Sequence, residues 1–160
     1  LAGAIRRNDP FLAGFLDSPP QTNETARAGM LLPGFLTIAR ETGLPLALSE
    51  IGSSAGLNLF FERFRYDYGG RMWGPAESAA RLAPEVRGKA PPLEGDLTIA
   101  DRAGNDIAPV DIFDPAQRLR LRSYIWADQA ARLARLDAAI SIAPKRGSIG
   151  TAGRRSSSAA

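Results

Sequence analysis

The residues best suited to chemistry in this chain form a glycine-rich turn at positions 50–56, Glu-Ile-Gly-Ser-Ser-Ala-Gly. The turn follows an apolar run at 44–48 and precedes an amphipathic stretch at 57–64. Many nucleotide-binding proteins use a strand, a tight glycine turn and a helix start, because small residues let the backbone approach a ligand. The N-terminus of the helix adds free N–H groups and a partial positive charge. The turn therefore predicts a ligand site.

Two known chemistries of such turns fit this sequence incompletely. A dinucleotide fingerprint requires Gly-x-Gly-x-x-Gly, but the small residues here are Gly52, Ser54 and Gly56, so the third position does not fit. The nucleophile elbow of hydrolases requires Gly-x-Ser-x-Gly, which residues 52–56 match with Ser54 as the nucleophile. That serine needs a base, usually histidine, and the chain contains none. A hydrolase is thus an alternative that requires a histidine from outside this chain.

The third chemistry uses an acidic residue followed by Gly-x-Gly-x-Gly directly after the first strand. In this respect the turn resembles motif I of class I S-adenosylmethionine-dependent methyltransferases. Glu50, Gly52, Ser54 and Gly56 hold the matching positions, with Ser54 in place of the middle glycine. The resemblance implies that these four residues bind S-adenosylmethionine.

A second segment, Gly-Asn-Asp-Ile-Ala-Pro at 104–109, resembles the run that ends the second strand of such enzymes. The resemblance implies that Asp106 binds the ribose hydroxyls, which suits a carboxylate because it can accept two O–H bonds. The ribose acid normally follows the glycine turn by ~20 residues, whereas Asp106 follows Gly56 by 50 positions. An aspartate that only forms a turn is the alternative.

Four segments together resemble an uncharacterised bacterial family, domain of unknown function 2332, whose sequences are themselves methyltransferase-like. They are Gln-Thr-Asn-Glu at 21–24, then 50–59, 65–70 and 119–126. The resemblance spans roughly residues 21–142, and members of the family continue beyond the point where this chain enters its Ser/Gly/Arg tail. It implies a small-molecule cofactor and leaves the methyl acceptor unspecified.

The composition bounds the class of protein. With 160 residues, 44% of them hydrophobic, the chain can bury the core of about one domain. It has no cysteine and no histidine, so we predict no metal site. No apolar run is long enough to span a bilayer and no secretory segment opens the chain, so we expect a cytoplasmic protein.

The net charge of +3 comes from the end of the chain. Four of the 20 basic residues are Lys145, Arg146, Arg154 and Arg155, which leaves 16 basic against 17 acidic residues elsewhere. The rest of the chain therefore lacks the excess of basic residues that is typical of a nucleic-acid-binding surface.

The elements around the turn predict an α/β fold. We expect a helix at 24–42 that is capped by Thr22 or Asn23, interrupted at Pro33-Gly34 and ended by Gly43. Strands at 46–51 and 97–100 should be parallel and adjacent, and the segment 65–96 between them should be irregular, with a short helix at 76–82. A last helix should cover 115–142, with Asp114 as its cap and Leu119 on its buried side. The first strand is apolar rather than alternating, which is typical of a strand covered on both faces.

Together these elements indicate the N-terminal part of a doubly wound, Rossmann-like parallel sheet. The sheet is incomplete, because only two strands are visible in the sequence. We assign residues 1–20 to an N-terminal helical remnant, 21–143 to a partial methyltransferase-like domain and 144–160 to a disordered basic tail. Such a fragment is expected to be inactive as given. The alternatives are the hydrolase and a non-catalytic fragment.

Overall fold

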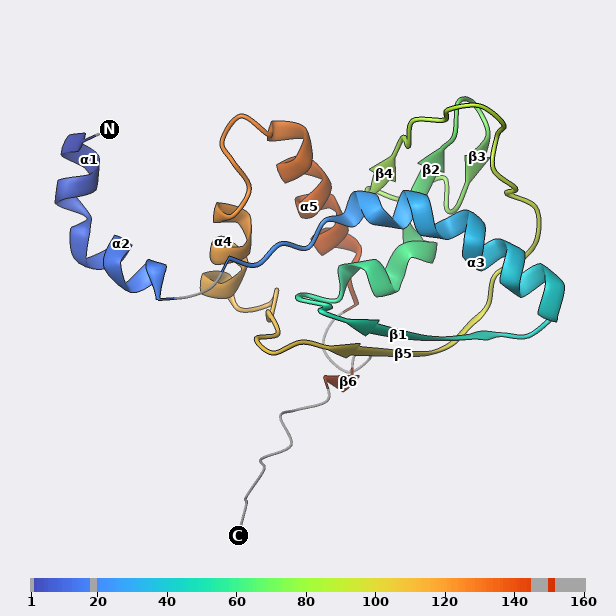
Figure 1. Ribbon diagram of the computed structural model, residues 1–160, viewed down its shortest axis with the longest axis horizontal. Helices are drawn as coiled ribbons and strands as arrows, with labels where there is room; N and C mark the ends of the chain where they lie inside the picture. The colour runs from blue at the N-terminus through green and yellow to red at the C-terminus, as the bar shows by residue number, and fades with distance from the viewer. Residues whose placement is uncertain (1, 18–19, 145–149, 152–160) are drawn as a thin grey trace, which may run out of the picture.

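The computed structural model describes residues 2–17, 20–144 and 150–151, and within them the chain is a mixed α/β structure (Figure 1). Its helices are α1 (Ala2–Arg7), α2 (Asp9–Leu16), the 3₁₀ helix η1 (Thr25–Arg27), α3 (Ala28–Thr42), the 3₁₀ helix η2 (Leu57–Arg63), α4 (Pro115–Ser123) and α5 (Ala130–Ile142). Its strands are β1 (Leu46–Ile51), β2 (Arg65–Asp67), β3 (Met72–Trp73), β4 (Arg81–Leu82), β5 (Ile99–Asn105) and β6 (Gly150–Thr151).

A parallel pair of strands, β1 and β5, is the centre of the larger sheet. The predicted first strand is confirmed, and so is its parallel neighbour, although β5 extends beyond the expected 97–100. Ile51 lies opposite Asn105 in the register, so both strands end at the same edge. The glycine turn and Asp106 therefore leave the sheet side by side.

β6 pairs with β5 in parallel on the side away from β1. Gly150–Thr151 thus forms a strand within the tail that we expected to be disordered. The rest of that prediction, over residues 145–149 and 152–160, lies outside the described residues.

Only one face of β1 is covered by described elements. α3 and η2 lie on the same side of the β1–β5 pair (Figure 1), and Leu48 is buried beneath them. Ala47, Ser49 and Ile51 point the other way and are exposed, Ile51 to 91%. The expectation of a strand buried on both faces is therefore wrong for the described structure, because no described helix packs on the second face.

α3 continues through Pro33 instead of breaking there. Proline cannot donate to the carbonyl four residues earlier, which is that of Gly29. The Tyr68 hydroxyl donates to this carbonyl at 2.5 Å and supplies the missing bond. Gly43 ends the helix as predicted, with a φ of 65° and its N–H donating to Ala39. The first turn of the predicted helix is the separate 3₁₀ helix η1, whose N-cap is Glu24 rather than Thr22 or Asn23, and α3 follows it without a side-chain cap.

The segment 65–96 contains a small three-stranded sheet, in the order β3-β2-β4, where a short helix was expected at 76–82. β2 pairs with β3 antiparallel and with β4 in parallel. Tyr66 on β2 is fully buried and stacks on Tyr68, with Trp73 against its edge. Each of these strands has only two or three residues, which is too short for an alternating pattern to appear in the sequence.

The helix predicted at 115–142 is two helices, α4 and α5, although Asp114 caps the first as expected. Leu121 and Leu136 both belong to the hydrophobic core. In one straight helix they would stand roughly 22 Å apart, at 1.5 Å per residue, whereas the break between α4 and α5 lets the two helices fold against each other. The break also leaves Leu119 exposed, contrary to prediction.

The N-terminal helices α1 and α2 bury none of their described residues. Phe15 contacts Tyr124 at a ring-centroid distance of 5.6 Å. Among the described residues, no helix combines the length and the apolar character that crossing a membrane requires.

Candidate functional site

The glycine turn has three residues in the left-handed region of backbone conformation. They are Gly52, Ser54 and Gly56, with φ angles of 70°, 52° and 69°. Ser54 is the sole non-glycine residue with positive φ in the described part of the chain. Left-handed conformations cost non-glycine residues free energy. Ser54 therefore adopts a backbone conformation that is typical of glycine.

Three N–H groups of the turn are used within the protein. Those of Gly52 and Ser53 donate to the Asn105 carbonyl at 2.7 and 3.2 Å, and that of Gly56 donates to the Ser53 carbonyl at 2.7 Å. The helix that follows is a short 3₁₀ helix with a kink at Phe60. The expectation of free N–H groups is thus wrong for Gly52, Ser53 and Gly56.

Asp106 fixes the turn from the end of β5. One of its carboxylate oxygens accepts from the Ser54 N–H at 2.7 Å. The other accepts from the Ala108 N–H at 2.9 Å and from the Gln21 amide at 3.1 Å. A carboxylate offers about four acceptor positions, so three of them are already occupied. The turn-forming role is therefore present, and one acceptor position remains.

The segment 21–24 lies against the turn and was not predicted as part of a site. The Asn23 amide donates to the Ser53 carbonyl at 2.9 Å, and the Gln21 amide donates to the Ala108 carbonyl at 2.6 Å. Glu24 forms an ion pair with Arg132 of α5 at 2.6 Å. The signals in the sequence were this run of four polar residues after Pro20 and its place among the segments that resemble the family.

Buried oxygens without partners surround the turn. They are Gln21 Oε1, Asn23 Oδ1, Glu50 Oε2, Ser54 Oγ and Asn58 Oδ1. Each belongs to the turn, to the helix after it or to the segment that covers it. A buried polar atom without a partner costs ~1–3 kcal/mol, so these oxygens require donors from water or from a ligand. Four of the five are carbonyl or carboxylate oxygens, which can only accept.

Glu50 projects from β1 toward the covered face and is half-buried. Burial raises the pKa of its carboxyl group, while the neighbouring Asn58 amide and the charge of Arg27 lower it in part. The net direction is upward, so the folded protein favours the neutral acid more than the unfolded chain does. At neutral pH the buried charge of Glu50 therefore opposes folding.

Glu50→Gln should raise the melting temperature at pH 7, because it removes this charge and keeps the shape of the side chain. Because the pKa of Glu50 is higher in the folded state, protonation of this residue favours folding. The gain is complete at a pH below the pKa of the unfolded chain, and it is lost as the pH rises through the pKa of the folded protein. The advantage of the variant should accordingly shrink toward pH 4. Thermal unfolding from pH 4 to 7 measures it, with Glu41→Gln on the exposed face of α3 as the control. Equal shifts for both variants at every pH would contradict the assignment.

The serine of the hydrolase alternative does not have the surroundings of a nucleophile. Ser54 is 6% exposed and its hydroxyl oxygen has no partner among the described residues. An activated serine donates to an adjacent base. In the described structure no base lies beside the Ser54 hydroxyl, so the hydrolase alternative still requires one from outside this chain. Nor do the described residues contain three acidic, histidine or cysteine side chains grouped to hold a metal.

The fold and the site define a mixed α/β protein with a glycine turn at the common end of two parallel strands, closed by a polar N-terminal segment. The family model of an "Uncharacterized protein conserved in bacteria (DUF2332)" matches residues 1–148. The chain belongs to this family, as predicted, and the match extends beyond the expected 21–142. No curated protein and no solved structure matches it.

Proposed function

We propose that the glycine turn binds S-adenosylmethionine and that the domain is methyltransferase-like. The observation that carries this proposal is the group of unpartnered buried oxygens around the turn. S-adenosylmethionine has a positively charged sulfonium and an ammonium group that donates hydrogen bonds. A site rich in acceptors and containing Glu50 suits such a cation, because opposite charge and donor groups satisfy the buried oxygens.

The state of the turn disfavours a ligand bound by its phosphates. Phosphate sites in strand-turn-helix units use free backbone N–H groups. Here the N–H groups of Gly52, Ser53, Ser54 and Gly56 are engaged by protein oxygens. A ligand without phosphate, which presents donors instead of acceptors, fits the described groups better.

The position of the site also supports this assignment. Ligands of open α/β sheets bind beyond the carboxyl ends of parallel strands, where β1 and β5 end together. The exposed face of β1 is the one that a doubly wound sheet would cover with helices. We therefore infer that the parallel pair belongs to a sheet of the doubly wound, Rossmann-like kind.

Each residue of the turn has a distinct part in this proposal. Glu50 orients the amino-acid end of the cofactor, and Gly52 and Gly56 let the backbone pass close to it. Ser54 keeps the left-handed conformation between them. Asp106 contributes its one remaining acceptor position to a ribose hydroxyl while it holds the turn.

Isothermal titration of the folded protein with S-adenosylmethionine and with its demethylated product tests the proposal. We expect binding that Glu50→Gln weakens by about 10-fold or more, the effect of losing a charge-assisted hydrogen bond of ~1.5–3 kcal/mol. Glu41→Gln should leave the affinity unchanged. If folded protein gives no heat with either ligand at millimolar concentration, the cofactor assignment is wrong.

A further inference from the structure

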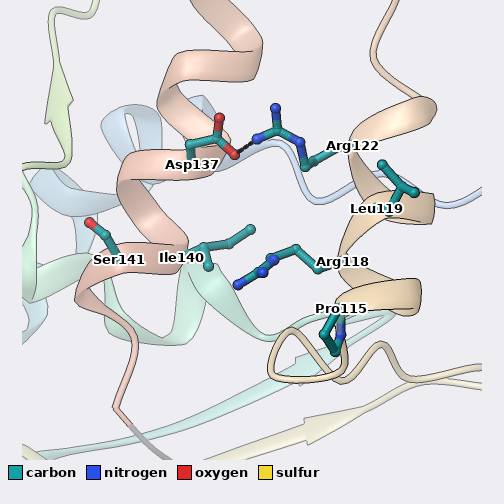
Figure 2. Close-up of a pocket in the computed structure, with 7 residues that line it drawn as sticks. All are labelled: Pro115, Arg118, Leu119, Arg122, Asp137, Ile140 and Ser141. Atoms are coloured by element: carbon teal, nitrogen blue, oxygen red, sulfur yellow. Dashed lines mark hydrogen bonds and ion pairs between the residues drawn. The ribbon is translucent and has the colours of Figure 1, made fainter.

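A groove between α4 and α5 is separate from the glycine turn (Figure 2). Its volume is about 590 Å³, within the range of clefts that hold small molecules, ~300–1,000 Å³. It is lined by Pro115, Arg118, Leu119, Arg122, Asp137, Ile140 and Ser141. The first four come from α4 and the last three from α5, so the groove exists only because the predicted single helix folds back on itself.

The groove has an excess of positive charge. Arg118 and Arg122 are four residues apart on α4 and therefore project from the same face of the helix. Arg122 forms an ion pair with Asp137 across the groove. Arg118 extends from α4 toward Ile140, as Figure 2 shows, and its guanidinium has no carboxylate partner within the described ranges. Among the described residues, one arginine of the groove is thus paired with a carboxylate and the other is not.

The rest of the lining is largely apolar. Pro115 and Leu119 on α4 and Ile140 on α5 are among its lining residues. Leu119 is 64% exposed in spite of its size. An apolar surface beside an unpaired guanidinium suits a molecule that has one anionic end and one hydrocarbon part.

We propose that this groove binds a small carboxylic acid with an apolar body. Arg118 pairs with the carboxylate, to which a guanidinium can donate two parallel hydrogen bonds. Leu119 and Ile140 bury the hydrocarbon part, and the Arg122–Asp137 pair closes one side. This inference does not depend on the cofactor assignment at the glycine turn.

The groove is nevertheless connected to the turn through the chain. The Val110 N–H donates to the Ser54 carbonyl at 3.1 Å, and the Asp111 N–H donates to the Gln117 side chain at 2.9 Å. These bonds fix the segment between Asp106 and α4. The groove and the glycine turn are thus joined by one hydrogen-bonded segment of the chain.

Octanoate is the probe, followed by the backbone amide signals of the isotope-labelled protein in solution. Octanoate should shift the signals of Arg118, Leu119, Ile140 and Ser141. Arg118→Gln should weaken its binding by about 10-fold, because the charge-assisted pair is lost. Arg120→Gln is the matched control on the same helix, since Arg120 does not line the groove, and it should change the affinity less than about twofold.

Two further ligands separate the parts of the proposal. Neutral octanamide should bind about 10-fold more weakly than octanoate, and inorganic phosphate should compete poorly because it has no apolar part. The proposal is overturned if octanoate shifts signals elsewhere only or if Arg120→Gln costs as much as Arg118→Gln. It is also overturned if octanamide or phosphate binds as well as octanoate. Titration of the glycine turn with S-adenosylmethionine is a separate measurement, so each site can fail alone.

Discussion

Asp106→Ala should lower the free energy of unfolding by ~1.5–3 kcal/mol, the usual effect of losing hydrogen bonds to a charged group. The substitution leaves the buried N–H of Ser54 without its acceptor and releases Ala108 and Gln21 as well. Ser54 has a strained left-handed backbone, which persists only while its surroundings hold it. We therefore expect the whole glycine turn to loosen, not only a ligand contact to disappear.

Chemical denaturation measures the loss, and Asp101→Ala is the matched control. Asp101 is an exposed aspartate on the same strand, β5, and its replacement should change stability by less than about 0.5 kcal/mol. The free energy of unfolding of Asp106→Asn should lie between those of Asp106→Ala and Asp101→Ala, because asparagine keeps one acceptor oxygen and loses the charge. If Asp106→Ala is as stable as the control, the carboxylate does not hold the turn.

The same variant separates two roles of Asp106. A residue that only binds ribose would lose affinity for S-adenosylmethionine and keep full stability. A residue that organises the turn loses both. Since three acceptor positions of Asp106 already serve the protein, we expect both to fall together.

The sequence predicted those features of the fold whose causes are local. β1 has the expected bounds because its apolar run ends at the glycine turn. Gly43 and Asp114 end and begin helices as expected, because a left-handed cap and a side-chain cap each depend on one residue. The turn itself was recognisable for the same reason, since Gly52 and Gly56 both have positive φ.

The features that the sequence did not indicate depend on partners far along the chain. α3 continues through Pro33 because Tyr68 satisfies the carbonyl of Gly29, and no local pattern contains that bond. Gln21 and Asn23 join the site through residues that follow them by 30 positions or more. The groove arises only when α4 and α5 fold against each other. In each case the local preference is weak and tertiary contacts decide the outcome.

Gly104→Val should destabilise the protein by ~1–3 kcal/mol, the usual cost of overpacking a close-packed interior. Gly104 is buried on β5 opposite Glu50. A Cβ atom at this position would lie 2.7 Å from Ser53 Oγ and 3.2 Å from Leu59 Cδ1. Glycine is thus required here because the turn lies too close to β5 to leave room for a side chain, and not because of the φ and ψ angles of Gly104.

Denaturation of a small set of variants can locate this clash. Ala100→Val is the control, since Ala100 is exposed on the same strand, and it should change stability by less than about 0.5 kcal/mol. Gly104→Ala should be milder than valine, and it should be partly rescued by Ser53→Gly, which removes the nearest atoms. Such a coupling between the two positions, measured by a double-mutant cycle, would show that the turn packs directly on β5. Additive effects would mean that Gly104 does not make room for Ser53, and the close approach on which the site depends would have to be abandoned.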